Sequence, residues 1–317
     1  MHYDPQAHFL QLSDWSAERL AATLNLALRL KQELADRGGH EPLLHGRTLA
    51  MIFEKPSLRT RVSFAVAMTQ LGGSGLLLRQ EEVGLDTREP TADVARVLSG
   101  MVDAIMIRTF EQTRVEKLAH HAGVPVINGL TDLCHPCQAM ADLLTLREHF
   151  GDLRGRTLAF VGDGNNVARS LAVACGKFGL RFVLATPPAY ALPEADVDRI
   201  MSQVPELDFV ITHDPADAVR HADCIYTDTW VSMGQESEKA QRVRDFQGFR
   251  VDEALLARAP DHAVVLHCLP AYRGYEISDA VLEGPRSRVF PQAHNRLHAQ
   301  KAILLELLAP AAAARYR

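Results

Sequence analysis

The chain has 317 residues, of which 47% are hydrophobic and 23% charged, the composition of an ordinary globular protein. Its length predicts two domains of about 150 residues each. A net charge of −5 argues against nucleic acid as the main partner, and no apolar run reaches the ~18 residues of a membrane span. The N-terminus lacks a signal-peptide pattern, and an odd number of scattered cysteines, five, indicates reduced thiols, so a cytoplasmic protein is expected.

Helical and extended patterns alternate through the first half of the chain. A helix is expected from about Ser13 or Asp14 to Asp36, with leucines at helical spacing and Gly38-Gly39 as its end. Short apolar runs then alternate with amphipathic ones. The expected strands lie near 48–53, 75–78, 103–108 and 124–127, and the expected helices near 61–71, 91–100, 111–121 and 137–150.

A break at 151–155 separates this series from a second one. The second series begins with a strand at 157–161, and the expected later strands lie near 182–186, 208–211, 223–227 and 263–266. A last apolar helix, about 293–309, has no strand after it. This rhythm predicts an α/β protein of two domains, 1–150 and 151–317, each a parallel-sheet βαβ sandwich.

The segment 53–61, Phe-Glu-Lys-Pro-Ser-Leu-Arg-Thr-Arg, lies where an expected strand passes into a helix. This position puts Ser57, Thr60 and several backbone N–H groups at a helix N-terminus, which favours an anion. Arg59 and Arg61 add guanidiniums that match phosphate or carboxylate oxygens. Taken alone, the same pattern also fits a helix cap with two solvated arginines.

Four further segments carry polar side chains at comparable places. They are His135-Pro-Cys-Gln138, Asp228-Thr-Trp-Val-Ser-Met-Gly234, His267-Cys-Leu-Pro270 and Asn295-Arg-Leu-His-Ala-Gln300. The motifs follow expected strands that end at Phe53, Ile107, Ile127, Val161, Thr227 and Leu266. Because ligands of parallel α/β sheets bind at the carboxyl ends of strands, these side chains are candidates for one ligand site.

Two other motif readings are weaker. Val161-Gly-Asp-Gly-Asn-Asn-Val167 has two of the glycines of a dinucleotide site, but Val167 stands where the third belongs, and no acidic residue ends the next strand at 184–186. Cys134 and Cys137 satisfy a C-x-x-C zinc or redox pattern, but the chain has no second such pair. The segment is interpreted through His135 and Gln138 instead.

Over essentially its whole length the chain resembles the aspartate/ornithine carbamoyltransferase family, and its Ser-Met-Gly and His-Cys-Leu-Pro segments resemble the ornithine branch. The resemblance implies transfer of a carbamoyl group from carbamoyl phosphate to the δ-amine of L-ornithine, which yields L-citrulline and phosphate. It implies no metal and no organic cofactor. It also implies a role in arginine biosynthesis or the reverse catabolic use, and a last helix that returns to the first domain.

The resemblance also implies roles for individual residues. Those expected at carbamoyl phosphate are Ser57, Leu58 (through its backbone), Arg59, Thr60, Arg108, His135, Gln138, Cys268, Leu269 and Arg296. Those expected at ornithine are Asn166, Asp228, Ser232 and Met233. Arg108, His135, Asp228 and Cys268 are the expected catalytic set, with Asp228 at the α-amino group and Cys268 beside the reacting amine.

Three positions depart from the family pattern. Leu58 replaces a usual threonine, which is tolerable where only the N–H is used. His294 stands before Asn295-Arg296 where glutamate is usual. In the family, the loop at 79–90 reaches a neighbouring subunit of a trimer, often through a glutamine; here Gly84 falls at that position, so Gln80, Arg88 or no residue serves.

Rival interpretations remain. A sibling carbamoyltransferase would act on putrescine, aspartate or an acylated ornithine, but the 79–90 loop has no lysine, which an aspartate enzyme would want. Putrescine lacks the α-carboxylate and α-amino groups that Asn166, Asp228 and Ser232 are expected to bind. A non-enzymatic relative would be expected to lack Arg59, Arg108 or His135, and all three are present.

Overall fold

The computed structural model describes residues 4–316. Two compact units divide the chain: the first includes residues 4–144 and 294–316, and the second is Thr145–Ala293. Two helices, α6 (Pro136–Phe150) and α13 (Val289–Leu308), begin in one unit and end in the other. Residues from the end of the sequence are therefore part of the first unit.

The first unit contains a four-stranded sheet in the order β2-β1-β3-β4, in which all neighbours are parallel. Its strands are β1 (Thr48–Phe53), β2 (Ser74–Arg79), β3 (Ala104–Arg108) and β4 (Val126–Leu130). The register puts Phe53 beside Arg108, so the segment after β1 and the guanidinium that ends β3 lie at the same edge of the sheet.

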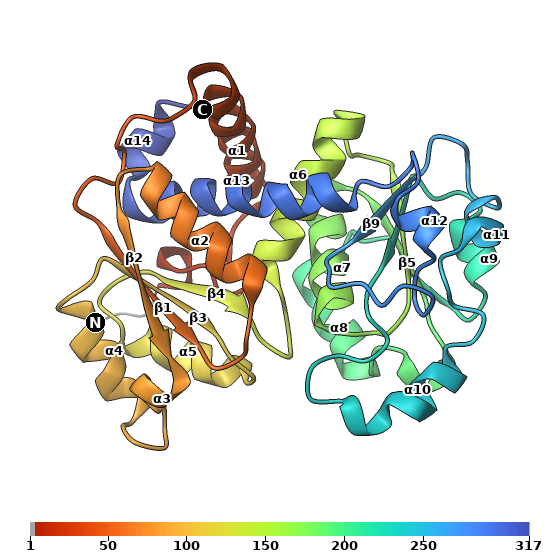
Figure 1. Ribbon diagram of the computed structural model, residues 1–317, viewed down its shortest axis with the longest axis horizontal. Coiled ribbons are helices and arrows are strands. Elements are labelled where there is room, and N and C mark those ends of the chain that lie inside the picture. The colour runs from red at the N-terminus through yellow and green to blue at the C-terminus, as the bar shows by residue number, and fades with distance from the viewer. Residues whose placement is uncertain (1–3, 317) are drawn as a thin grey trace. The chain divides into compact units, whose positions relative to one another are not determined.

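Helices cover this sheet (Figure 1). The helices that lie entirely within the first unit are α1 (Ala17–Arg37), α2 (Leu58–Gln70), α3 (Gln80–Val83), α4 (Thr91–Ser99), α5 (Gln112–His121) and α14 (Pro310–Ala314), with short 3₁₀ turns at Pro5–Ala7 and Leu12–Asp14. Ala50, Ile52, Ile105 and Ile107 form one buried cluster with apolar residues of α4 and α5. Because side chains alternate along a strand, this cluster uses every second residue of β1 and β3.

The second unit contains a five-stranded parallel sheet in the order β7-β6-β5-β8-β9. Its strands are β5 (Thr157–Val161), β6 (Arg181–Ala185), β7 (Phe209–Thr212), β8 (Cys224–Thr227) and β9 (Val264–His267). Its helices are α7 (Asn166–Phe178), α8 (Glu194–Gln203), α9 (Pro215–Val219), α10 (Lys239–Asp245), α11 (Glu253–Leu256) and α12 (Asp279–Leu282), with 3₁₀ turns at Pro188–Tyr190 and Glu236–Glu238. The order changes direction at β5, so β5 and β8 form the switch point where such sheets bind ligands.

The two-sheet α/β architecture confirms the predicted fold class, while three helix starts differ from prediction, and one of them is that of α2, which begins at Leu58 rather than near 61. The first helix begins at Ala17 rather than near Ser13, because Trp15 is extended and Ser16 is the N-cap, with its hydroxyl accepting from the Arg19 N–H. The last long helix begins at Val289, four residues before the predicted start. Arg296 therefore lies inside this helix rather than at its beginning.

Among the described residues, none of the helices combines the length and apolar character that crossing a membrane requires.

Candidate active site

The N-terminus of α2 in the first unit has the features of an anion site. Ser57 is the N-cap of this helix, and its hydroxyl accepts a hydrogen bond from the Thr60 N–H at 3.2 Å. The Leu58 side chain is 72% exposed, so a leucine here leaves the backbone N–H groups of the first turn unaffected. Arg59 is half-buried, whereas Arg61 is exposed. The structure thus separates the two arginines that the sequence pattern had grouped.

Arg296 connects helix α13 to this N-terminus. Its Nη2 donates to the Thr60 hydroxyl at 3.0 Å, and its Nη1 donates to the side-chain oxygen of Gln138 at 2.7 Å. The Gln138 amide nitrogen donates in turn to Asp142 at 2.8 Å. Arg296, Gln138 and Asp142 are all buried. The chain of hydrogen bonds fixes which end of the Gln138 amide faces the guanidinium.

His135 is a buried residue next to three positive charges. Burial lowers the pKa of His135 well below its usual range, and Arg296, Arg108 and Arg59 lower it further. The imidazole is therefore neutral near pH 7, and one of its nitrogens carries a proton that it can donate. A neutral donor among guanidiniums suits a ligand that is anionic at one end and has a carbonyl oxygen at the other.

Glu54 and Lys55 hold the segment between β1 and α2 through hydrogen bonds and ion pairs, a role that the sequence did not indicate. The Glu54 carboxylate accepts from the Thr109 hydroxyl and from Arg114, and the Glu54 N–H donates to the Arg108 carbonyl at 2.9 Å. Lys55 donates to Asp132 and lies over the Phe110 ring at 4.1 Å. Glu54 and Lys55 are both buried. Burial of a charged residue is what marks these two as part of the site, and the sequence does not show it.

Asp228 is at the centre of the candidate site in the second unit. It follows β8, is buried, and accepts hydrogen bonds from the Asn165 amide at 2.8 Å and from the Cys268 thiol at 3.0 Å. Asn165 is also the N-cap of α7, where its oxygen accepts from the N–H groups of Val167 and Ala168. Asn165 was missed by the sequence analysis, although asparagine directly before a helix is a strong cap signal.

Asn166 is the first residue of α7 and half-buried. Its position at a helix N-terminus in the second unit is compatible with binding a carboxylate, the role that the sequence resemblance implies.

His267 lies close to Asp228 and Cys268, with potential ligand atoms of the three residues within 4.8 Å of one another. Both imidazole nitrogens are already engaged, however. Nδ1 accepts from the Leu269 N–H at 2.8 Å, and Nε2 contacts Glu276 at 3.1 Å. Because the accepting Nδ1 must be unprotonated, the proton is on Nε2, and neither nitrogen offers a lone pair to a metal.

Ser232 and Met233 lie on the loop between β8 and α10, where Ser232 is half-buried and Met233 is 48% exposed. The Ser232 N–H donates to the side chain of Gln235, and Gly234 adopts a positive φ of 93°.

The buried Arg242 contacts residues at both ends of this loop. It donates to Glu238 at 2.9 Å, to the Trp230 carbonyl at 3.1 Å and to Asp163 at 2.9 Å. Burial raises the pKa of Asp163, and the positive charge of Arg242 opposes that rise. The two ends of the 231–237 loop are thus held by one guanidinium, while the residues between them are more exposed.

Cys134 and Cys137 are buried free thiols. Burial raises the pKa of each to about 12, so neither thiol is a thiolate near neutral pH. Such cysteines are inert, which weakens the zinc and redox readings of C-x-x-C.

The 79–90 loop forms the short helix α3 and a tight turn. Gly84 ends α3 in the left-handed region with φ 60°, a conformation that favours glycine. Gln80 is the first residue of α3, and Arg88 donates to the Glu82 carbonyl at 3.3 Å.

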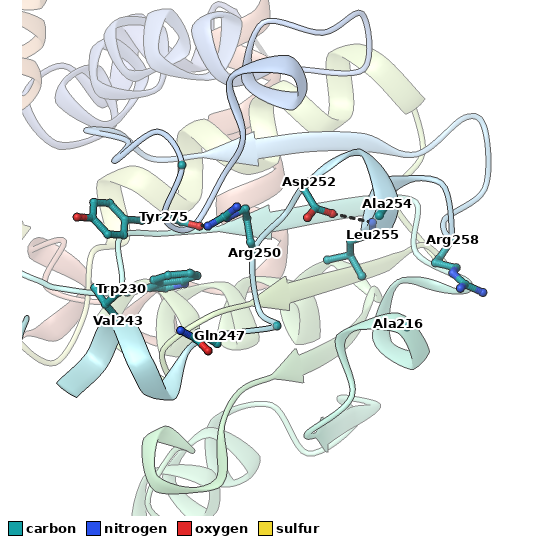
Figure 2. A pocket seen from close by; sticks show the side chains of 12 residues that line it. Ala216, Trp230, Val243, Gln247, Arg250, Asp252, Ala254, Leu255, Arg258 and Tyr275 are labelled. Carbon is teal, nitrogen blue, oxygen red and sulfur yellow. Dashed lines mark hydrogen bonds between the residues drawn. The ribbon is translucent and has the colours of Figure 1, made fainter. Parts of the chain in front are cut away.

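The second unit also contains a cavity of about 550 Å³, shown in Figure 2, that is lined by Trp230, Gln247, Arg250, Leu255 and Tyr275 among others. None of the predicted site residues lines it. The candidate site is therefore defined by its polar contacts rather than by this cavity.

Comparisons with known proteins match the chain in two parts. Residues 7–148 match the family domain "Aspartate/ornithine carbamoyltransferase, carbamoyl-P binding domain", and residues 154–307 match "Aspartate/ornithine carbamoyltransferase, Asp/Orn binding domain". The anion-binding features lie within the first match, apart from Arg296. Asn165, Asp228 and Cys268 lie within the second.

Individual relatives are similar over nearly the full length. The chain is 51% identical to the ornithine carbamoyltransferase of Anoxybacillus flavithermus over 302 residues, which cover 95% of this chain and 96% of that protein. It is 50% identical to that of Carboxydothermus hydrogenoformans over 303 residues, which cover 95% and 97%. The solved ornithine carbamoyltransferase of Pyrococcus furiosus superposes with a TM-score of 0.91 at 47% identity and covers 95% of this chain and 96% of that one. The chain belongs to the aspartate/ornithine carbamoyltransferase family.

Proposed function

We propose that this protein transfers the carbamoyl group of carbamoyl phosphate to the δ-amine of L-ornithine and so forms L-citrulline and phosphate. The observation that carries the proposal is the setting of His135, a neutral imidazole whose pKa is lowered by burial and by the charges of Arg296, Arg108 and Arg59. The relatives at about half identity over 95% of the chain are ornithine carbamoyltransferases, which supports ornithine as the acceptor.

The first unit supplies what carbamoyl phosphate needs. Its near-dianionic phosphate would be bound by the N–H groups of the first turn of α2, by Ser57 and Thr60, and by the guanidiniums of Arg59 and Arg108. His135, Arg108 and the Arg296–Gln138 pair would polarise the carbonyl as its oxygen becomes an oxyanion. One such preorganised donor typically contributes ~3–4 kcal/mol to the transition state.

The second unit supplies what the amine needs. The δ-amine of ornithine resembles a lysine with a pKa near ~10.4, so making it neutral at pH 7 costs roughly 4–5 kcal/mol. Asp228 would bind the α-ammonium group, with its carboxylate oriented by Asn165 and the Cys268 thiol. Cys268 and the Leu269 carbonyl would lie beside the reacting amine, and Asn166, Ser232 and Met233 would complete the ornithine contacts.

The sibling substrates fit these side chains less well. Putrescine carries no α-amino or α-carboxylate group for Asp228 and Asn166 to bind. An aspartate enzyme would be expected to carry a lysine in the 79–90 loop, and that loop has none. An acylated ornithine has no α-ammonium charge to match the buried carboxylate of Asp228.

We also propose a homotrimer, or a multiple of trimers, in the cytoplasm, with a role in arginine biosynthesis or its reverse. Family membership supports the trimer, and sedimentation analysis measures it directly. If the 79–90 loop completes a neighbour's pocket, mixing an Arg59→Ala protein with a loop variant restores part of the activity through hybrid sites. No recovery in demonstrably mixed oligomers would show that each subunit's site is self-contained.

The reaction is tested with protein treated with EDTA, since neither a metal nor an organic cofactor is part of the proposal. Carbamoyl phosphate is supplied with ornithine, putrescine, aspartate or acetylornithine in separate assays. Citrulline and phosphate should appear in equal amounts with ornithine. Product from another amine, with none from ornithine, would overturn the assignment.

A further inference from the structure

The segment that carries Cys268 and Leu269 has an unusual backbone. Leu269 has a φ of 57°, in the left-handed region that a leucine rarely adopts. Its N–H donates to Nδ1 of His267, two residues earlier, at 2.8 Å. The backbone of the proposed amine-binding segment is therefore held by an imidazole side chain.

A buried carboxylate determines which form of that imidazole is present. Glu276 Oε1 lies 3.1 Å from Nε2 of His267 and also accepts from the Tyr272 N–H at 2.5 Å. His267 and Glu276 are both 0% exposed. With its proton held on Nε2 by the carboxylate, the ring keeps Nδ1 free of hydrogen and able to accept from Leu269.

The His267 backbone is held separately. Its N–H donates to the Gln292 side chain at 2.9 Å, and Gln292 donates to the Tyr226 hydroxyl at 3.1 Å. The imidazole is thus not required to position its own main chain. The two ring nitrogens instead contact residues that follow His267 in the sequence, namely Leu269 and Glu276.

We infer that His267 and Glu276 are positioning residues for carbamoyl transfer, which act by holding the Leu269 backbone beside Cys268. The inference rests on the proposed function. Cys268 lies between the two members of the His267–Leu269 hydrogen bond, and its thiol donates to Asp228. A packing role alone would be met by an apolar pair, because a buried carboxylate is costly, and Glu276 Oε2 has no hydrogen-bond partner among residues 4–316.

Two pairs of variants separate positioning from packing. His267→Leu removes the acceptor for the Leu269 N–H, whereas His267→Asn keeps an oxygen that can accept from the N–H two residues on. Glu276→Leu removes both acceptor contacts, whereas Glu276→Gln keeps an oxygen for His267 and Tyr272. His262→Leu is the matched control, because His262 also contacts an aspartate, Asp223, at 3.0 Å but is exposed.

We expect kcat for citrulline formation to fall roughly 5- to 150-fold in His267→Leu and Glu276→Leu, the rate equivalent of leaving the part-buried Leu269 N–H without this partner. The asparagine and glutamine variants should recover at least half of that loss on a logarithmic scale. KM for carbamoyl phosphate should stay within about twofold, and His262→Leu should match the wild type. All assays are run at a temperature well below the lowest Tm among these variants, so that unfolding does not lower the measured rate.

A second readout needs no turnover. Amide hydrogen exchange at Leu269 should be slow in the wild type and in His267→Asn, and faster in His267→Leu. Equal kcat in the leucine and asparagine variants, or wild-type exchange at Leu269 as fast as in His267→Leu, would overturn the inference. Failure of the proposed function is distinguishable, because the wild type itself would then form no citrulline.

Discussion

The guanidinium of Arg296 donates to the side-chain oxygen of Gln138 at 2.7 Å, across 158 positions of sequence. The same guanidinium donates to Thr60, and the Gln138 amide nitrogen donates to Asp142. A residue near the end of the sequence therefore determines the orientation of an amide in α6 and contacts the first turn of α2. All four side chains are at most 2% exposed, so water competes little with these hydrogen bonds.

Arg296→Lys should weaken binding and catalysis although it keeps the charge. A lysine cannot donate to Gln138 and Thr60 at once with the planar fork of a guanidinium. We expect kcat/KM for carbamoyl phosphate to fall by about 10- to 100-fold, equivalent to roughly 1.4–2.8 kcal/mol. Steady-state kinetics measures the loss. Kinetics within threefold of the wild type would show that the fork is not used in the reaction.

Arg59→Ala should raise KM for carbamoyl phosphate, with a total loss of several kcal/mol, on the order of 3, in transition-state binding. Arg61→Ala is the control, because Arg61 is exposed two residues away while Arg59 is half-buried and contributes to the charge around His135. Calorimetric titration with carbamoyl phosphate compares the two. Equal effects of both substitutions would mean that a general positive field, rather than the α2 N-terminus, binds the phosphate.

Asp228→Asn should raise KM for ornithine and lower kcat, with little change in carbamoyl phosphate binding. The buried carboxylate would lose its charge opposite the α-ammonium group. Putrescine should be a poor substrate of the wild type and should lose less on this substitution. Asp214→Asn provides a control, because Asp214 is an exposed N-cap and asparagine caps a helix about as well as aspartate, so the kinetics should match the wild type. Equal losses for ornithine and putrescine would contradict the assignment.

Lys301→Met should change how stability depends on pH. Burial lowers the pKa of Lys301 from 10.5 to about 8, and its ammonium lies 2.8 Å from Nε2 of His40. The folded state therefore releases this proton at lower pH than the unfolded state, so the Lys301 contribution to stability rises between pH 8 and 10.5, by about 3 kcal/mol at most. Urea unfolding at pH 7.5 and 10 measures the slope. The free energy of unfolding of the wild type should rise from pH 7.5 to pH 10 relative to that of Lys301→Met. An equal change in both proteins would show that Lys301 does not titrate in this range.

Local sequence patterns determined the elements and the chemical character of the motifs. The run from β1 into α2 follows from an apolar strand, a serine cap and the helix that it begins, all of which depend on neighbouring residues. The parallel sheets follow from the alternation of such runs. The helix starts at Ala17 and Val289 were misplaced. The indole N–H of Trp15 donates to the His8 carbonyl, seven residues earlier, and the Ser287 hydroxyl accepts from the Val289 N–H at the start of α13.

Tertiary structure alone decided which of these side chains work together. Arg59 and Arg61 are equivalent in the sequence, but the helical turn buries one and exposes the other. Asn165, Glu54 and Lys55 gained their roles only from contacts with partners more than 50 residues away in the sequence. The physical reason is that hydrogen bonds and pKa shifts depend on distance and desolvation, which folding sets between residues whose spacing in sequence carries no such information.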